Sequence, residues 1–293
     1  MPHTTTDDGV RLHYEESGSG VPVVFVHEFA GDHRSWEPQV RHFSRRYRCV
    51  VYAARGFPPS DVPTDPASYG QARAVDDLAA VLDAIGAERA HVVGNSMGGF
   101  CALHFGLRYP RRALSLTVAG CGYGAHPDAR QKFREESEKV AIAFETEGSA
   151  AMSTWYGHGP ARVQFQNKDP RGHAEHVTVL AEHDPVGAAL TMRNVQKERP
   201  SLYDLRAELS TMDVPVLVVA GDEDEGVLET DLMLKRTLPR AGLLVLPKTG
   251  HVSNLEEPEL FNLHLERFLA QADHDRWPPR DPRSLSPSTT GAK

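Results

Sequence analysis

The chain has 293 residues and a mass of 32.3 kDa, which is the size of one large domain or two small ones. Hydrophobic residues make up 40% of the chain and charged residues 25%, and this composition excludes a wholly disordered protein. The formal net charge of −8 argues against a nucleic-acid or anionic-membrane partner, because such partners favour a basic surface.

The cysteines and the N-terminus bear on the cellular compartment. Cys49, Cys101 and Cys121 lie in or beside apolar runs, and an odd, sparse set predicts buried thiols in a reducing compartment rather than a disulfide framework. The N-terminus lacks the basic start and apolar stretch of a signal peptide, and no run approaches the ~18 apolar residues of a membrane span. We therefore expect a cytoplasmic protein.

Short apolar runs recur along the chain and predict the strands of a sheet. An alternating segment, 10–16, comes first and suits an antiparallel edge strand. The later runs are continuously apolar, as expected of strands covered on both faces. They span residues 21–29, 49–53, 90–93, 114–119, 214–220 and 243–246.

Helical patterns separate these strands. Apolar residues at helical spacing run from Ala74 to Ile85, and Gly86 stands where a C-terminal cap belongs. A second helix is expected from Met97 to the residue before Pro110, and a last one after Pro258. Alternating strands and helices predict an α/β fold with a mostly parallel, doubly wound sheet.

The middle of the chain breaks this alternation. No convincing strand occurs between about residues 122 and 209, where 135–147 and 185–197 look helical and the rest is rich in Gly, His and Pro. This composition predicts a helical cap inserted between two halves of one sheet. The expected organisation is a core of residues 1–121 and 210–272, a cap of residues 122–209 and a disordered tail of residues 273–293.

The pentapeptide Gly94-Asn95-Ser96-Met97-Gly98 matches the G-x-S-x-G motif. An apolar strand ends just before it and a helix begins at Met97, which is the strand–turn–helix setting of a nucleophile elbow. The helix start would direct backbone N–H groups, that of Met97 among them, at a developing oxyanion. The alternative is an ordinary tight turn in which Ser96 caps the helix.

A serine hydroxyl needs a base, and the base needs an acid to orient it. His251 follows the last predicted strand and precedes the last helix. Four carboxylates, Asp222 to Glu225, follow the strand 214–220, at a carboxyl end where open α/β sheets bind ligands. The order serine, acid, histidine is the one found on this scaffold, so Ser96, one of these carboxylates and His251 form a candidate triad.

With these motifs the chain resembles the α/β-hydrolase fold family over roughly residues 10–270. The resemblance implies that the acid is Asp224, three residues after Gly221, and that the N–H of Phe29 joins that of Met97 in the oxyanion hole. It also implies a structural role for His27. Glu28 departs from the family, which usually has a glycine there, and a carboxylate facing the hole would oppose the developing negative charge.

The resemblance also bears on the branch of the family. A serine nucleophile disfavours epoxide hydrolases and haloalkane dehalogenases, which use aspartate. The elbow resembles that of C–C hydrolases acting on ring-fission products, but those enzymes usually carry a tryptophan where Val252 follows His251 here. The expected function is therefore a serine esterase or lactonase acting on a small molecule. A C–C hydrolase, or a ligand-binding receptor that retains the triad with little turnover, is the alternative.

The cap carries no readable motif. Trp155, Tyr156 and His158, and Trp36 outside the cap, are expected to pack rather than to contact substrate. The histidines of 173–183 match no metal-ligand spacing, so we expect a solvated histidine-rich loop, with no metal and no cofactor. The oligomeric state and the substrate are left open.

Overall fold

The computed structural model describes residues 2–285 and 290. Within these residues a single sheet has eight strands in the order β1-β2-β4-β3-β5-β6-β7-β8. The strands are β1 (His3–Thr5), β2 (Arg11–Ser17), β3 (Pro22–Val26), β4 (Arg48–Tyr52), β5 (Ala90–Asn95), β6 (Ala113–Ala119), β7 (Val216–Gly221) and β8 (Ala241–Leu246).

The strands from β4 to β8 in this order pair in parallel, while β2 runs antiparallel to β4. This confirms the expected mostly parallel sheet with an antiparallel strand at its N-terminal side. The prediction that segment 10–16 forms the edge is wrong, because the three-residue strand β1 pairs on its outer side.

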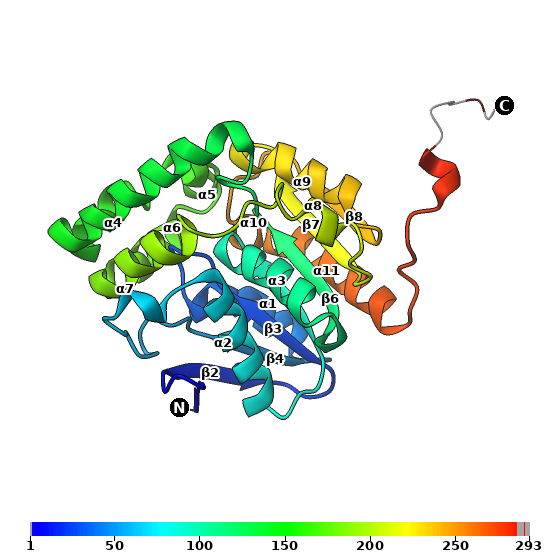
Figure 1. The fold of residues 1–293 in the computed structure, drawn as a ribbon, viewed down its shortest axis with the longest axis horizontal. Coiled ribbons are helices and arrows are strands. Elements are labelled where there is room, and N and C mark those ends of the chain that lie inside the picture. Colours follow the sequence, from blue (N-terminus) through cyan, green and yellow to red (C-terminus); the bar gives the residue numbers. More distant parts are fainter. Residues whose placement is uncertain (1, 286–289, 291–293) are drawn as a thin grey trace.

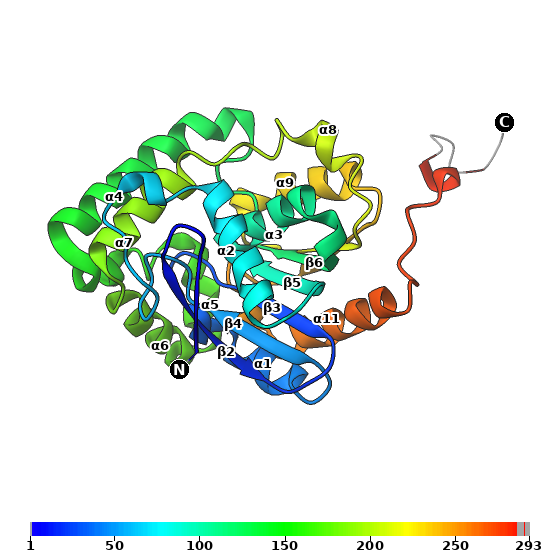
Figure 2. The ribbon, with the colours of Figure 1, turned by 60° about the horizontal axis from the view of Figure 1, so that its bottom comes forward.

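Helices cover both faces of the sheet (Figures 1 and 2). Side chains of α2, α3 and α9 join the core on one face, and those of α1 and α11 join the core on the other. The helices of this part are α1 (Glu37–Phe43), α2 (Gln71–Ala84), α3 (Met97–Arg108), α8 (Arg206–Leu209), α9 (Glu225–Thr237), α10 (Ser253–Glu256) and α11 (Pro258–Asp273), with short turns η1 (His33–Trp36), η2 (Pro66–Ser68), η3 (Pro110–Arg112) and η6 (Pro282–Leu285).

Residues 122–209 contain no strand, and helices α4 to α7 of this segment lie together to one side of the sheet (Figure 1). The division into a core and a cap at residues 122 and 209 stays a prediction. Its long helix α4 bends at Gly148, where φ is 80°. No helix among the described residues is both long and apolar enough to cross a membrane. The elements of the insertion are α4 (Pro127–Trp155), η4 (Pro160–Arg162), α5 (Val163–Lys168), α6 (Pro170–Ala181), α7 (Pro185–Leu190) and the π-helical turn η5 (Thr191–Gln196).

The start of the expected disordered tail packs against the core. The ring of Trp277 contacts that of Phe268 at 4.8 Å between centroids, and its Nε1 donates a hydrogen bond to the carbonyl of Arg240. The tail segment up to this residue therefore departs from the expected disorder, because one large aromatic side chain anchors it. Residues 286–289 and 291–293, which the same prediction covers, lie outside the described residues.

Candidate active site

Ser96 lies in a strained turn between β5 and α3. Its φ of 53° and ψ of −112° are unusual for a residue with a Cβ, and strain of this kind marks functional turns. The neighbouring glycines are required: a Cβ on Gly94 would lie 2.1 Å from the carbonyl oxygen of Gly98, and one on Gly98 would lie 2.0 Å from that of Val26. The Ser96 side chain makes no capping hydrogen bond, so the alternative of a simple helix cap has no support.

His251 and Asp224 are in direct contact. Nδ1 of His251 lies 2.7 Å from Oδ2 of Asp224, and both side chains are buried. Asp224 follows β7 and His251 follows β8, two adjacent parallel strands whose carboxyl ends meet at one edge of the sheet. The second oxygen of Asp224 accepts a hydrogen bond of 2.9 Å from the hydroxyl of Tyr123.

The pKa of His251 reflects two opposing influences. Burial disfavours the imidazolium, but the charge of Asp224 and its hydrogen bond outweigh burial and raise the pKa above its ordinary value. The negative charge of Glu28 acts in the same direction. An imidazole with this environment is suited to accept a proton and to be stabilised as a cation.

The end of β6 connects the serine to the histidine. The N–H of Ser96 donates a 2.7 Å hydrogen bond to the carbonyl of Ala119. The Cβ position of the next residue, Gly120, lies 3.0 Å from the carbonyl oxygen of His251 and 3.3 Å from its Nδ1. Ser96 and the His251–Asp224 pair therefore occupy the same edge of the sheet. Gly120 lies between the backbone of Ser96 and that of His251.

The loop after β3 holds the expected oxyanion residue Phe29. Its side chain is buried against Phe57 and against Phe144 and Tyr156 of the cap, with centroid separations of 5.7–6.2 Å. Met97 is the first residue of α3, a position whose N–H has no partner within the helix. The joint role of these two N–H groups in an oxyanion hole stays a prediction.

His27 braces the same loop. The N–H of Ala54 donates to its Nε2 at 3.0 Å, which makes Nε2 the acceptor and leaves Nδ1 to donate to the carbonyl of Glu28 at 2.7 Å. These two bonds tie the loop after β3 to the loop after β4. They fit the structural role that the resemblance implies for His27.

Glu28 is buried and paired with the cap. Its Oε2 lies 2.8 Å from Nη2 of Arg162, and its Oε1 lies 3.1 Å from Nε2 of His176. Burial favours the neutral acid, but the Arg162 and His176 groups outweigh burial and hold the pKa of Glu28 well below its ordinary value. Arg162 also lies over the Tyr156 ring, 5.3 Å from its centroid.

The histidines of the cap are not solvated, so that expectation is wrong. His173 and His176 lie on the inner side of α6 and His183 lies just beyond it, and all three are buried. Nε2 of His173 donates to the carbonyl of Gly157 at 2.9 Å. Burial lowers the pKa of His183 to about 3, so this ring stays neutral.

The aromatic residues expected to pack divide into two groups. Trp36 is buried against Phe25 and Phe261, as expected. Trp155 is 47% exposed and His158 is exposed as well, and their rings contact Tyr156 at 6.2 Å and His173 at 5.0 Å between centroids, so these two side chains pack only in part. Trp155 is the last residue of α4, and His158 follows it by three residues.

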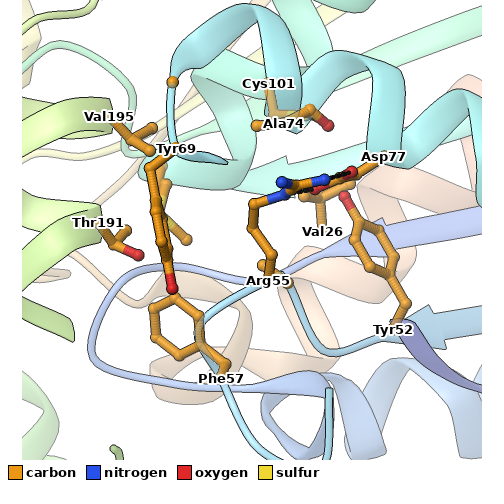
Figure 3. Close-up of a pocket in the computed structure, with 13 residues that line it drawn as sticks. Val26, Tyr52, Arg55, Phe57, Tyr69, Ala74, Asp77, Cys101, Thr191 and Val195 are labelled. Atoms are coloured by element: carbon orange, nitrogen blue, oxygen red, sulfur yellow. Dashed lines mark hydrogen bonds and ion pairs between the residues drawn. The ribbon is translucent and has the colours of Figure 1, made fainter. Parts of the chain in front are cut away.

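A small cavity is lined by Arg55, Tyr69 and Asp77 among other residues (Figure 3). Its volume is about 30 Å³, and Met97 is one of its lining residues, whereas Ser96 and His251 are not. The guanidinium of Arg55 pairs with Asp77 at one wall, at 2.6 Å, and Tyr69 lies opposite. A space of this size does not hold an organic substrate, so we assign it no binding role.

Two residues of this region, Tyr123 and Arg162, were not predicted from the sequence. Tyr123 follows β6 by four residues, and the neighbouring carboxyl ends of β6 and β7 were the available signal that it would approach Asp224. Arg162 had no such signal, because its partner Glu28 is 134 residues away in the chain.

Residues 21–258 match the family model described as alpha/beta hydrolase fold. The chain is 29% identical over 245 residues to the 3-oxoadipate enol-lactonase 1 of Acinetobacter baylyi, covering 82% of this chain and 85% of that protein. It is 28% identical over 267 residues to the 2-hydroxy-6-oxo-6-phenylhexa-2,4-dienoate hydrolase of Burkholderia cepacia, covering 89% and 91%. A solved thermophilic esterase from Thermogutta terrifontis has a TM-score of 0.81 at 26% identity, covering 92% of this chain and 98% of that chain.

Proposed function

The chain belongs to the alpha/beta hydrolase fold family, and within this family we propose that it is a serine hydrolase that cleaves small ester-type substrates, lactones included, through an acyl-enzyme. The observation that carries the proposal is the 2.7 Å contact between His251 and Asp224 at the same sheet edge as the strained Ser96 turn. The resemblance to a named enol-lactonase and a named esterase supports the substrate class.

In the proposed mechanism Ser96 Oγ attacks the substrate carbonyl carbon while Nε2 of His251 takes the hydroxyl proton. Asp224, on Nδ1, holds the imidazole in the required tautomer and stabilises the cation that forms. Backbone N–H groups of Met97 and Phe29 stabilise the oxyanion. The imidazolium then protonates the leaving oxygen, and water, deprotonated by His251, releases the acyl group and restores Ser96.

The contacts of Glu28 bear on the oxyanion step. Its carboxylate is paired with Arg162 and lies beside His176, so its charge is balanced within the protein. This arrangement removes the main objection to hydrolysis, which was an unpaired negative charge beside the oxyanion. It favours an enzyme over the alternative of a receptor with little turnover.

A fluorophosphonate probe tests the nucleophile directly. We expect one adduct on the native protein by intact mass, none on Ser96→Ala, and a native level on Ser210→Ala, whose exposed hydroxyl is a matched control. An unlabelled native protein, or equal labelling of Ser96→Ala, contradicts the proposal. An unlabelled protein that still binds small carbonyl compounds supports the receptor instead.

The second candidate is a C–C hydrolase, favoured by the relative named as a dienoate hydrolase and by the elbow sequence. Values of kcat/KM for a five-membered lactone, an aryl ester and a 2-hydroxy-6-oxo-dienoate separate the two. We expect the lactone or the ester to be preferred. Preference for the dienoate, with turnover lost in Ser96→Ala, assigns the C–C reaction instead.

We also propose that the protein is cytoplasmic. All three cysteines are buried free thiols, which suits a cytoplasmic enzyme. Fractionation of the native host, with a secreted protein as reference, tests this placement.

A further inference from the structure

We propose that His13, Glu15 and His33 form a binding site for a zinc-type divalent cation, separate from the hydrolytic site. His13 and Glu15 are two residues apart on β2, so their side chains leave the same face of the strand. His33 comes from η1, the short turn that follows the loop after β3. The sequence predicts no metal site, because only the fold brings these three side chains together.

The distances suit one metal ion. Nε2 of His13 lies 3.1 Å from Oε1 of Glu15, and Nε2 of His33 lies 3.6 Å from the same oxygen. All three ligand atoms lie within 4.8 Å of one another. In a tetrahedral zinc site with bonds of about 2.0–2.1 Å, ligand atoms are roughly 3.3 Å apart, so small side-chain movements complete the geometry.

The two imidazoles are oriented so that their Nε2 atoms could share one cation. Both Nε2 atoms face a single carboxylate oxygen, and neither His13 Nδ1 nor His33 Nδ1 has a hydrogen-bond partner within the described part of the chain. A cation bound to both Nε2 atoms places the proton on each Nδ1, where Asp32, with Oδ1 3.8 Å from His33 Nδ1, is the nearby acceptor for one ring.

The surroundings allow a metal to enter and to keep a water ligand. The three residues line a broad groove of about 1420 Å³ between β2, the η1 region and α6. The Glu15 side chain is 48% exposed, while those of His13 and His33 are 0% and 9% exposed. Two imidazoles and one carboxylate favour Zn²⁺, Co²⁺ or Ni²⁺ over Mg²⁺ or Ca²⁺, which prefer oxygen ligands.

The site would act on stability rather than on the reaction. Its ligands join β2, near the N-terminal margin of the sheet (Figure 2), to the segment that follows the oxyanion loop. A bound cation therefore fixes this segment against the sheet. Esterase turnover, which depends on Ser96, does not require it.

The test is a Co²⁺ and Zn²⁺ titration of the chelator-treated full-length protein. We expect one Co²⁺ per chain with visible absorption typical of nitrogen ligands, displacement by Zn²⁺, and a higher Tm with Zn²⁺. Glu15→Gln and His33→Ala should each weaken binding at least tenfold and remove the rise in Tm. His13 is fully buried, so it is left unchanged.

The matched control is Glu266→Gln. It alters another His–Glu contact, in which Nε2 of His42 lies 3.4 Å from Oε2 of Glu266. This variant should bind like the native protein. Binding that is equal in the native protein, Glu15→Gln and His33→Ala, or the absence of stoichiometric binding, overturns the proposal. Fluorophosphonate labelling of Ser96 in the same samples is independent of the metal, so failure of this inference leaves the hydrolase proposal standing.

Discussion

Arg162 of the cap and Glu28 of the loop after β3 form a buried ion pair, with Nη2 of the arginine 2.8 Å from Oε2 of the glutamate. Their side chains are only 5% and 4% exposed. The pair joins the insertion to the loop that carries the expected oxyanion N–H of Phe29. Glu28 thus acts across the interface between cap and core, where the family usually has a small residue.

Breaking this pair from one side should destabilise the protein strongly. Glu28→Gln leaves the Arg162 charge buried without a counter-ion, and we expect a loss of about 3–5 kcal/mol in the free energy of unfolding. The double variant Glu28→Gln/Arg162→Gln should recover most of the loss, because neither charge remains. Urea denaturation of the four proteins of this cycle measures the coupling.

An exposed pair provides the control. Glu37 and Arg41 are in contact on α1, with side chains 55% and 78% exposed. Glu37→Gln should change stability by less than about 0.5 kcal/mol, because water already solvates both charges. Equal losses for Glu28→Gln and Glu37→Gln would mean that the buried pair does not hold the cap in place.

The pH dependence of hydrolysis should follow the ionisation of His251. The base works as the neutral imidazole, and its pKa is raised above the ordinary value of about 6.5. We therefore expect kcat/KM to rise with pH through a midpoint above about 6.5. A profile that is flat from mildly acidic to neutral pH argues against His251 as the base.

Removing the charge of Asp224 should shift the pH midpoint of kcat/KM to lower pH. Asp224→Asn removes the charge that raises the pKa of His251, while burial, which lowers it, remains. The midpoint should shift to lower pH, and kcat should fall by roughly 10⁴, the cost of the equivalent change in serine proteases. Asp222→Asn, two residues earlier and exposed, is the control and should keep both values.

Tyr123 should contribute less than the triad but measurably. Its hydroxyl donates to Asp224 Oδ1 at 2.9 Å, and its ring contacts that of His251 at 5.3 Å between centroids. Tyr123→Phe keeps the ring contact and removes the hydrogen bond to a charged group. We expect kcat to fall about tenfold or more, with KM little changed. The variant should also shift the pH midpoint upward. With one hydrogen-bond donor fewer, the Asp224 charge stabilises the His251 imidazolium more strongly.

Steady-state kinetics across pH decide this prediction. Tyr109→Phe removes another tyrosine–aspartate hydrogen bond, to Asp76, far from His251 in the chain. This control should leave kcat and the midpoint unchanged. Native kinetics in Tyr123→Phe would show that the hydrogen bond from Tyr123 to Asp224 has no effect on the reaction.

The sheet could be predicted because its strands are covered on both faces and are therefore continuously apolar. The run 114–119 becomes β6 (Ala113–Ala119), one residue longer. The run 21–29 overestimates β3, which ends at Val26, because His27 turns to brace two loops. The glycines around Ser96 could be interpreted from the sequence, since the demand for a missing Cβ is local.

The cap could not be predicted to the same depth. Its contacts are long-range and polar: His176 on α6 faces Glu28, and nothing near either residue in the sequence indicates the other. A histidine-rich, proline-containing segment resembles a solvated loop, but Asp169 caps α6 and Pro170 occupies its first position, so the segment is helical. Trp277, beyond the last predicted helix, likewise packs on residues distant in the sequence, Phe268 and Arg240.

Asp231 on α9 should limit stability at neutral pH. Its side chain is buried, and within the described residues neither carboxylate oxygen has a hydrogen-bond partner. Burial, with the nearby Asp224 charge, raises the pKa of Asp231 well above its ordinary value. The folded state therefore binds this proton more tightly than the unfolded state, and stability falls as pH rises above the unfolded value of about 3.9.

Asp231→Asn removes the titration while keeping the shape of the side chain. We expect it to increase the free energy of unfolding by about 1–3 kcal/mol at pH 8, and by progressively less as the pH is lowered below the unfolded pKa of about 3.9, where Asp231 becomes protonated in both states. Urea denaturation at several pH values measures the difference. Asp213→Asn, whose side chain is 77% exposed, should show no such pH-dependent gain. A gain independent of pH, or a loss at pH 8, would show that Asp231 does not carry a costly buried charge.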